Sequence, residues 1–270
     1  MLAPAAVLAI LLAPLPGPTV AVEDTMRTEV PEVLVRAPRV TLDEILARVA
    51  RGEARRDSLL RDESFLATLR VVRAAHGDHP PELVAESVSR VYRARPHRVR
   101  TLVLRRWEAK PGKRKSGDMD MNFDASMDET IVNFAFRPGA RDQFRYAIVG
   151  RDLVGGHLVY RIRFEPRSLL DPAAPHGLVW VDTNEFVIVR QEVGFDHPPA
   201  PPLISGVDRM VIEREFVDGM WMLHRVLLRL EFGLPLPKVG RGLDMSMQFD
   251  QIAVNRGIPD SVFTAPLVKR

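Results

Sequence analysis

The chain contains a long run of segments in which apolar and polar residues alternate, and this period of two constrains the fold more than any other feature. The pattern starts near residue 63 and continues to about residue 250. In residues 243–249, for example, Leu, Met, Met and Phe alternate with Asp, Ser and Gln. Alternation of this kind puts one face of a strand against a core and the other face in solvent. We therefore expect a mainly β protein.

Turn residues join these segments directly. Gly155-Gly156, the 182–185 stretch (DTNE) and Asp218-Gly219 each separate two alternating runs, and Asp-Gly favours a type I′ hairpin turn. No βαβ alternation occurs, so the strands are expected to be antiparallel. Eight to ten strands in one sheet must curl, split or close. The prediction is a strongly curved antiparallel sheet, or incomplete β-barrel.

One helix is expected before the strands. Thr41 and Glu44 form a capping box, and apolar residues follow at helical spacing, so residues 41–56 are predicted to be an amphipathic helix. We expect this helix to lie as a lid across the apolar face of the sheet. Pro80-Pro81-Glu82 predicts a second helical turn toward Val88. Residues 130–136 are predicted to be a strand, and residues 258–263 a tail that docks on the sheet.

The N-terminus has the layout of a secretory signal. An apolar stretch over residues 5–13 is followed by three prolines and by Thr19-Val20-Ala21, a small-x-small cleavage pattern. An uncleaved membrane anchor fits less well, because the prolines break a helix. The chain contains no cysteine, which excludes disulfides and lipidation on cysteine. The expected organisation is a signal peptide (1–21), an N-terminal arm (22–40) and a single domain (41–270). The product would be soluble in the periplasm and not lipid-anchored.

Motifs of enzymes and of metal sites are absent from the sequence. It contains no GxSxG, HExxH or P-loop motif. His76 and His79 lie next to a Pro-Pro pair and lack a third ligand, and the aspartates of residues 118–124 lack the glycine of a calcium loop. We therefore expect no enzyme activity, no cofactor and no metal. His224 interrupts an apolar strand face, where it binds either a ligand headgroup or a cross-strand carbonyl or carboxylate.

The apolar strand faces are the more informative chemistry. One sheet covered by one or two helices has more apolar surface than the helices can fill, which is typical of proteins that hold an apolar ligand. Methionine adapts to variable apolar guests, although an ordinary core also uses it as filler. The residues predicted to line an apolar ligand cavity are Leu158, Tyr160, Ile162, Phe164, Met222, Val226, Leu228, Leu230, Met245, Met247 and Phe249.

A basic band is the second candidate site. Residues 90–115 contain eleven Lys or Arg residues and one acid, Glu108, whereas the whole chain carries a net charge of only +3. Such a band either faces anionic headgroups or a partner, or it is a solvated strand face that pairs with acids elsewhere. No nucleic-acid-binding motif accompanies it. The residues predicted to contact a headgroup or a partner are Arg98, Arg100, Arg105 and Arg106.

Several stretches of the C-terminal half resemble the periplasmic lipoprotein-carrier superfamily, of the outer-membrane lipoprotein-sorting type. They are residues 158–167 (LVYRIRFEPR), 177–194 (GLVWVDTNEFVIVRQEVG), 211–230 (VIEREFVDGMWMLHRVLLRL) and 247–263 (MQFDQIAVNRGIPDSVF). The resemblance implies an incomplete β-barrel with a helical lid and an apolar cavity for acyl chains. It does not place the ligand-gating arginine of those carriers on any one arginine of this chain.

The resemblance and the apolar faces together predict a periplasmic binding protein or carrier. Its partner would be a lipid or an acylated protein, and no covalent chemistry would be involved. The alternative is an envelope interaction or stress-sensing module on the same fold, which contacts a membrane protein. Neither role involves nucleic acid.

Overall fold

The computed structural model describes residues 40–75, 80–109, 133–137, 139–168, 174–197, 204–236 and 240–264. The predicted signal peptide and nearly all of the predicted N-terminal arm lie outside these residues, as do His76, His79 and residues 118–124. None of the helices within the described ranges has the length and apolarity needed to cross a membrane.

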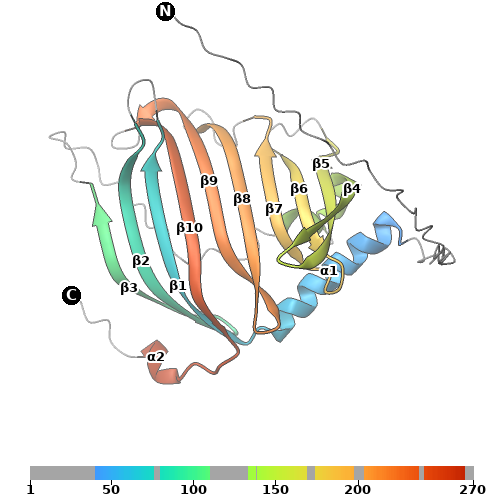
Figure 1. Ribbon diagram of the computed structural model, residues 1–270, viewed down its shortest axis with the longest axis horizontal. Coiled ribbons are helices and arrows are strands. Elements are labelled where there is room, and N and C mark those ends of the chain that lie inside the picture. Colours follow the sequence, from blue (N-terminus) through green and yellow to red (C-terminus); the bar gives the residue numbers. More distant parts are fainter. Residues whose placement is uncertain are drawn as a thin grey trace, which may run out of the picture. The chain divides into compact units, whose positions relative to one another are not determined.

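Ten antiparallel strands form one sheet in the order β3-β2-β1-β10-β9-β8-β7-β6-β5-β4 (Figure 1). The sheet is open, because the terminal strands β3 and β4 each pair with one neighbour among the described strands. The predicted curved antiparallel sheet with an N-terminal helix is confirmed. The strands are β1 (Asp62–Arg73), β2 (Glu82–Ala94), β3 (Arg98–Glu108), β4 (Phe144–Val154), β5 (His157–Pro166), β6 (Pro175–Asp182), β7 (Ile188–Phe195), β8 (Ile204–Val217), β9 (Met220–Leu236) and β10 (Gly240–Val254).

The predicted hairpins form because their turn residues adopt the required backbone. Asp218 and Gly219 both have positive φ, 51° and 83°, as a type I′ turn between β8 and β9 demands. Gly155 and Gly156 also have positive φ and join β4 to β5. The last strand, β10, then pairs with the first, β1, which brings the two ends of the domain together in the middle of the sheet.

The predicted helix is α1 (Leu42–Leu59). The Thr41 hydroxyl caps it by accepting a hydrogen bond from the Glu44 N–H at 3.2 Å. Ile45, Leu46 and Val49 are buried along one face, as the spacing predicts. A short C-terminal helix, α2 (Asp260–Thr264), lies against β3, where Arg98 pairs with Asp260. The expectation that this tail docks on the sheet is confirmed.

Two local predictions are wrong. The helical turn predicted from Pro80 toward Val88 is instead part of strand β2, since pairing with β1 and β3 outweighs the local helix-start signal. Of the strand predicted over 130–136, residues 130–132 lie outside the described residues, and Phe134–Phe136 form a 3₁₀ helix, η2. There the Phe136 N–H donates a hydrogen bond to the Asn133 carbonyl at 2.8 Å. The rings of Phe134 and Phe136 both pack edge-on against Phe164. A second 3₁₀ helix, η3 (Arg141–Gln143), precedes β4.

Candidate functional site

One face of the sheet packs against α1 and is called the helix-side face. Its larger apolar group, the helix cluster, joins α1 and η2 to strands from both halves of the sheet. The buried members of the helix cluster are Ile45, Leu46, Val49, Phe65, Ala67, Val91, Ala135, Phe136, Phe144, Tyr160, Ile162, Phe164, Val179, Val181, Ile188, Val193, Ile212, Leu223, Val226, Met247 and Phe249.

A second apolar group, the strand cluster, continues the same face. Leu69 packs against both clusters, and β10 contributes Leu243 and Met245 to this cluster and Met247 and Phe249 to the helix cluster, at steps of two. Among the described residues, no residue of a helix belongs to the strand cluster. Its buried members are Val71, Val84, Phe232, Leu243 and Met245, and Leu69, Ala85, Ile204, Leu228, Leu230 and Leu236 pack against them.

The eleven predicted cavity residues are divided between these clusters. Tyr160, Ile162, Phe164, Val226, Met247 and Phe249 belong to the helix cluster, and Leu228, Leu230 and Met245 to the strand cluster. Met222 is fully buried, with its sulfur 3.7 Å from an Arg56 nitrogen. Leu158 is the exception: it is 42% exposed, because it lies near the start of β5 opposite the exposed Leu153. The ligand-binding role of all eleven residues, Leu158 included, stays a prediction.

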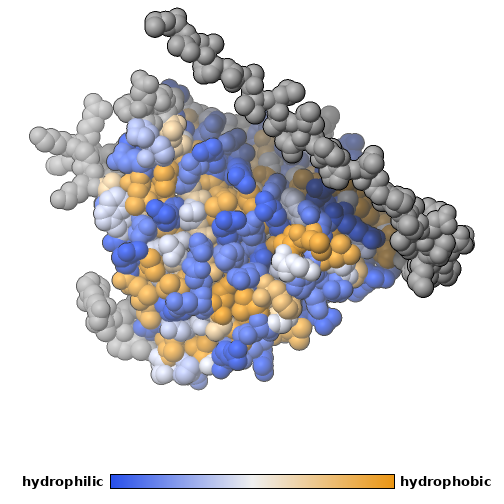
Figure 2. All heavy atoms as spheres, in the orientation of Figure 1, coloured by the Kyte–Doolittle hydropathy of each residue, from blue (hydrophilic) through white to orange (hydrophobic). Residues whose placement is uncertain are grey.

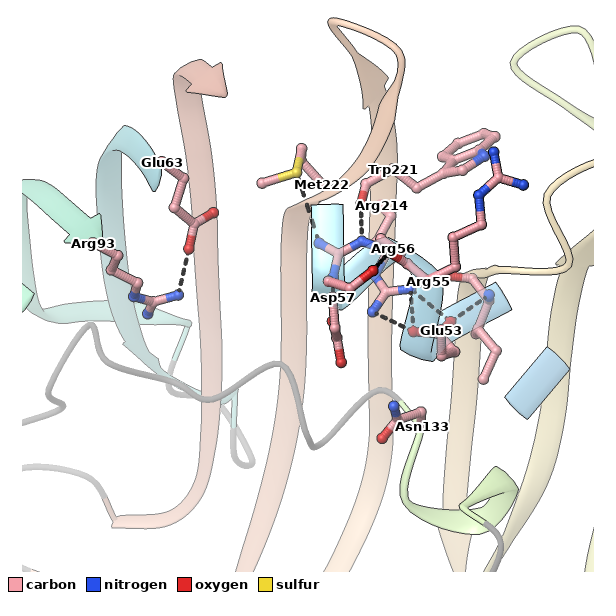
Figure 3. A network of polar contacts seen from close by, with 12 residues as sticks. Glu53, Arg55, Arg56, Asp57, Glu63, Arg93, Asn133, Arg214, Trp221 and Met222 are labelled. Carbon is pink, nitrogen blue, oxygen red and sulfur yellow. Dashed lines mark hydrogen bonds and ion pairs between the residues drawn. The ribbon is translucent and has the colours of Figure 1, made fainter. Parts of the chain in front are cut away.

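Helix α1 is attached to the sheet by a buried ion pair, Glu53 with Arg214 (Figure 3). The two Glu53 oxygens accept bonds from Arg214 at 2.9 to 3.2 Å. The Ile188 backbone completes the network: its N–H donates to Glu53 at 2.8 Å, and its carbonyl accepts from Arg214 at 2.9 Å. The network thus ties α1 to β7 and β8 at one point.

A second polar contact lies one turn further along α1. Arg56 is buried and donates from Nε to the Trp221 carbonyl of β9 at 2.5 Å, and it pairs with Asp57 at 3.1 Å (Figure 3). Gly52 lets the helix come this close, since a Cβ there would be 2.5 Å from the carbonyl oxygens of Glu185 and Phe186. The half of α1 that ends at Leu59 is therefore held by buried charged groups. The half that begins at Leu42 is held by apolar packing and by an exposed ion pair between Asp43 and Arg141 at 2.6 Å.

Sequence reasoning did not single out Glu53, Arg56 or Arg214. A signal was nevertheless present: Glu53 and Arg56 fall four and seven residues after Val49, on the apolar stripe of the helix. Arg214 similarly follows Met210 and Ile212 at steps of two. A charge on an apolar face indicates a buried partner.

An aromatic group closes the helix-side face beside β4. The rings of this group pack on one another, with centroids 5.2 to 6.4 Å apart in the contacting pairs. They belong to Phe134, Phe136, Phe144, Tyr146 and Phe164. The Tyr146 hydroxyl donates to the Ala135 carbonyl. Burial raises the pKa of Tyr146 to about 12, against the smaller opposing effect of Arg141 and Arg167.

The predicted basic band lies largely on β2 and β3, and its arginines have acidic partners. Arg98 pairs with Asp260, Arg105 with Glu86 at 2.5 Å, and Arg106 with Glu108 at 2.8 Å. Arg100 also has a polar contact. These side chains remain partly in solvent, and their contact with a headgroup or a partner stays a prediction. In the view of Figure 2, hydrophilic and hydrophobic side chains intermingle over the surface.

His224 lies 3.1 Å from the Glu215 carboxylate of the neighbouring strand, which favours the cross-strand partner over a ligand contact. Within the described ranges, no group of three or more His, Asp or Glu side chains could hold a metal. A cleft of about 350 Å³ lies between β5, β6, β7 and β8, but its lining includes Arg163, Glu165, His176 and Arg209 and none of the predicted cavity residues.

Comparisons with known proteins return matches only among solved structures: no family model and no curated protein matches the chain. A DUF1329 family protein from Desulfovibrio piger is 14% identical, with a TM-score of 0.42 over 82% of this chain and 97% of that one. An outer membrane lipoprotein-sorting protein domain from Vibrio parahaemolyticus is 11% identical, with a TM-score of 0.33 over 81% and 97%. A LolA superfamily protein from Nitrosomonas europaea is 12% identical, with a TM-score of 0.30 over 83% and 98%.

The names of these structures include an outer membrane lipoprotein-sorting protein domain, which is the class of protein that the sequence motifs resemble. The identities and TM-scores are low, so no function is transferred from these structures.

Proposed function

We propose that the protein is a periplasmic, non-enzymatic binding protein or carrier for lipids or lipidated proteins, and that acyl chains lie against the strand cluster. The observation that carries this proposal is the division of the helix-side face. Helix α1 packs on the helix cluster, whereas the strand cluster contains only strand residues within the described ranges. The apolar residues of this face therefore extend beyond those that α1 contacts.

The chemistry of the strand cluster suits a hydrocarbon chain. Its members are aliphatic except for Met245 and Phe232. Apolar burial contributes about 0.8 kcal/mol per methylene, and it has no directional requirement. We therefore expect affinity to depend on acyl-chain length more than on the headgroup.

Helix α1 has the asymmetry of a hinged lid. Glu53 and Arg56 fix the half that ends at Leu59 through buried polar contacts. The other half is held by the apolar packing of Ile45, Leu46 and Val49 and by one exposed ion pair, Asp43 with Arg141, which contributes little. Apolar packing can re-form against an acyl chain, but a broken buried ion pair is costly. We propose that the Leu42 end moves when a ligand enters and that the Glu53 end stays attached.

The test is lipid extraction from the full chain, expressed with its own N-terminus and purified from the envelope without detergent. Mass spectrometry is expected to detect acyl lipids in a stable ratio to protein. The matched control is the variant Leu230→Glu, which puts a charge in the strand cluster and should lose the lipid while keeping the far-UV circular dichroism spectrum. Protein that is repeatedly empty and binds no acyl probe would contradict the proposal.

A further inference from the structure

The outer edge of β3 has backbone groups with which no described strand pairs. Arg95 N–H donates to the Arg61 carbonyl at 2.9 Å, so Asp62 and Ala94 are a non-hydrogen-bonded pair of β1 and β2. The N–H and carbonyl of Ala94 therefore face β3 and bond Arg98, its partner there. By alternation, the N–H and carbonyl groups of Val99, Thr101 and Val103 point away from β2. In the part of the chain that the structure describes, no strand pairs with this edge.

The side chains of β3 combine exposed apolar groups with positive charge. Val99 and Val103 are 50% and 60% exposed, and Leu104 and Trp107 are also exposed. The strand carries four arginines and one acid, Glu108, which is a net charge of +3, while the charges of β2 cancel. Asp260 of α2 lowers the sum over β2, β3 and α2 to 0 + 3 − 1, so this edge keeps a net charge of about +2. The edge thus attracts negative charge.

The edge strand at the other end of the sheet, β4, differs from β3 because other elements pack against it. Strand β4 contacts α1 and η2, and its Tyr146 ring packs on Phe136.

Helix α2 reaches β3 at the first residue of the strand, where Arg98 lies over the Phe263 ring. A bulge follows between the Val88–Arg105 and Ser89–Val103 pairs, so residues 98–103 form the regular stretch of the edge.

We propose that β3 binds an extended, acidic segment of a partner protein, which adds as a strand to residues 98–103. The partner would place apolar side chains opposite Val99, Thr101 and Val103 and acidic side chains opposite Arg98 and Arg100, because directly opposite residues share a face. A second copy of this chain fits less well, since two β3 edges would oppose like charges. This interaction is independent of acyl binding on the helix-side face.

The probe is a fluorescein-labelled synthetic peptide of alternating valine and glutamate, into which the full chain is titrated while fluorescence anisotropy is measured. A peptide with lysine in place of glutamate is the matched control. Saturable binding of the glutamate peptide is expected, and salt should weaken it. Hydrogen exchange measured by NMR should slow at the Val99, Thr101 and Val103 amides, whereas Arg100 and Leu102 already bond to β2.

Two variants separate the backbone contribution from the charge contribution. Thr101→Pro removes one outward N–H and keeps the ladder to β2, and it should weaken binding by about tenfold. Arg100→Glu should weaken the glutamate peptide and strengthen the lysine peptide. Arg145→Glu on β4 is the control for a change of charge at the other edge, and acyl-probe binding should be unchanged in all three.

Equal binding of the two peptides, or unchanged exchange at the three amides, would overturn the proposal. So would a dimer of the chain that Thr101→Pro dissociates, because β3 would then bind a second copy. Binding to anionic lipid vesicles that survives Thr101→Pro, without peptide binding, would assign the charge to a membrane surface instead.

Discussion

At the residue scale, the buried pair of Glu53 and Arg214 determines how α1 is held. Two charges that leave water have a large desolvation cost, which their attraction and further hydrogen bonds offset. Here the Ile188 backbone supplies one donor and one acceptor within 2.9 Å. Because both partners must be in place at once, the pair specifies one position of the helix.

Loss of one partner should therefore be severe. We predict that Glu53→Gln lowers the free energy of unfolding by about 3–5 kcal/mol, because Arg214 would stay buried as an uncompensated charge. Urea denaturation measures this change. The control Glu44→Gln removes the exposed pair with Arg48 on the same helix, and it should cost less than about 1 kcal/mol. Equal effects of the two variants would contradict this reading of the buried pair.

Tyr146 makes stability depend on pH in the alkaline range. The pKa of Tyr146 is about 12 in the folded protein, against 10.0 for a tyrosine in solvent, so folding favours the neutral phenol. This contribution is complete below pH 10 and is lost as the pH rises toward 12. We predict a falling free energy of unfolding across this range and a smaller fall in Tyr146→Phe, both measured by urea denaturation at a series of pH values. The same slope in both proteins would assign the loss to other groups.

At the element scale, the sequence predicted most strands because alternation and turn residues are local signals. Asp218-Gly219 needed no tertiary information to give a hairpin. Residues 80–88 and 134–136 were mispredicted, because strand pairing in one case and aromatic packing on Phe164 in the other outweigh the local preference. The helix was predicted with its cap, but its attachment was not, since nothing local pairs Glu53 with a residue of β8.

Helix α1 lies so close to the β6–β7 turn that the usual effect of a glycine-to-alanine substitution is reversed at Gly52. Gly to Ala in a helix interior usually stabilises by roughly 1 kcal/mol. A Cβ at Gly52 would instead collide with two backbone carbonyls at 2.5 Å. We predict that Gly52→Ala lowers the melting temperature and speeds proteolysis within α1, whereas Arg51→Ala on the exposed side leaves both unchanged. A higher melting temperature for Gly52→Ala would show that the helix does not pack this closely.

At the scale of the whole molecule, two features depend on long-range contacts, which hydrophobic periodicity does not encode. They are the part of the helix-side face that α1 covers and the acidic partners of the basic band. Alternation identified which residues share a face, but not which part of that face α1 covers, so the eleven predicted residues were treated as one set. The basic band was likewise visible as a run of arginines, but its acids come from β2, α2 and β3 itself. The sequence thus indicated an apolar face and a basic edge, and the fold separates them into two surfaces.

The central claim is that the strand cluster binds acyl chains, and competition for a fluorescent acyl probe by fatty acids of increasing length tests it most directly. We predict that Kd falls about fourfold for each added methylene until the apolar surface is filled. Leu230→Glu in the cluster should abolish this dependence, and Leu234→Glu on the same strand, at a residue that is 70% exposed, should preserve it. Affinity that does not change with chain length, or an equal loss in both variants, would contradict the account.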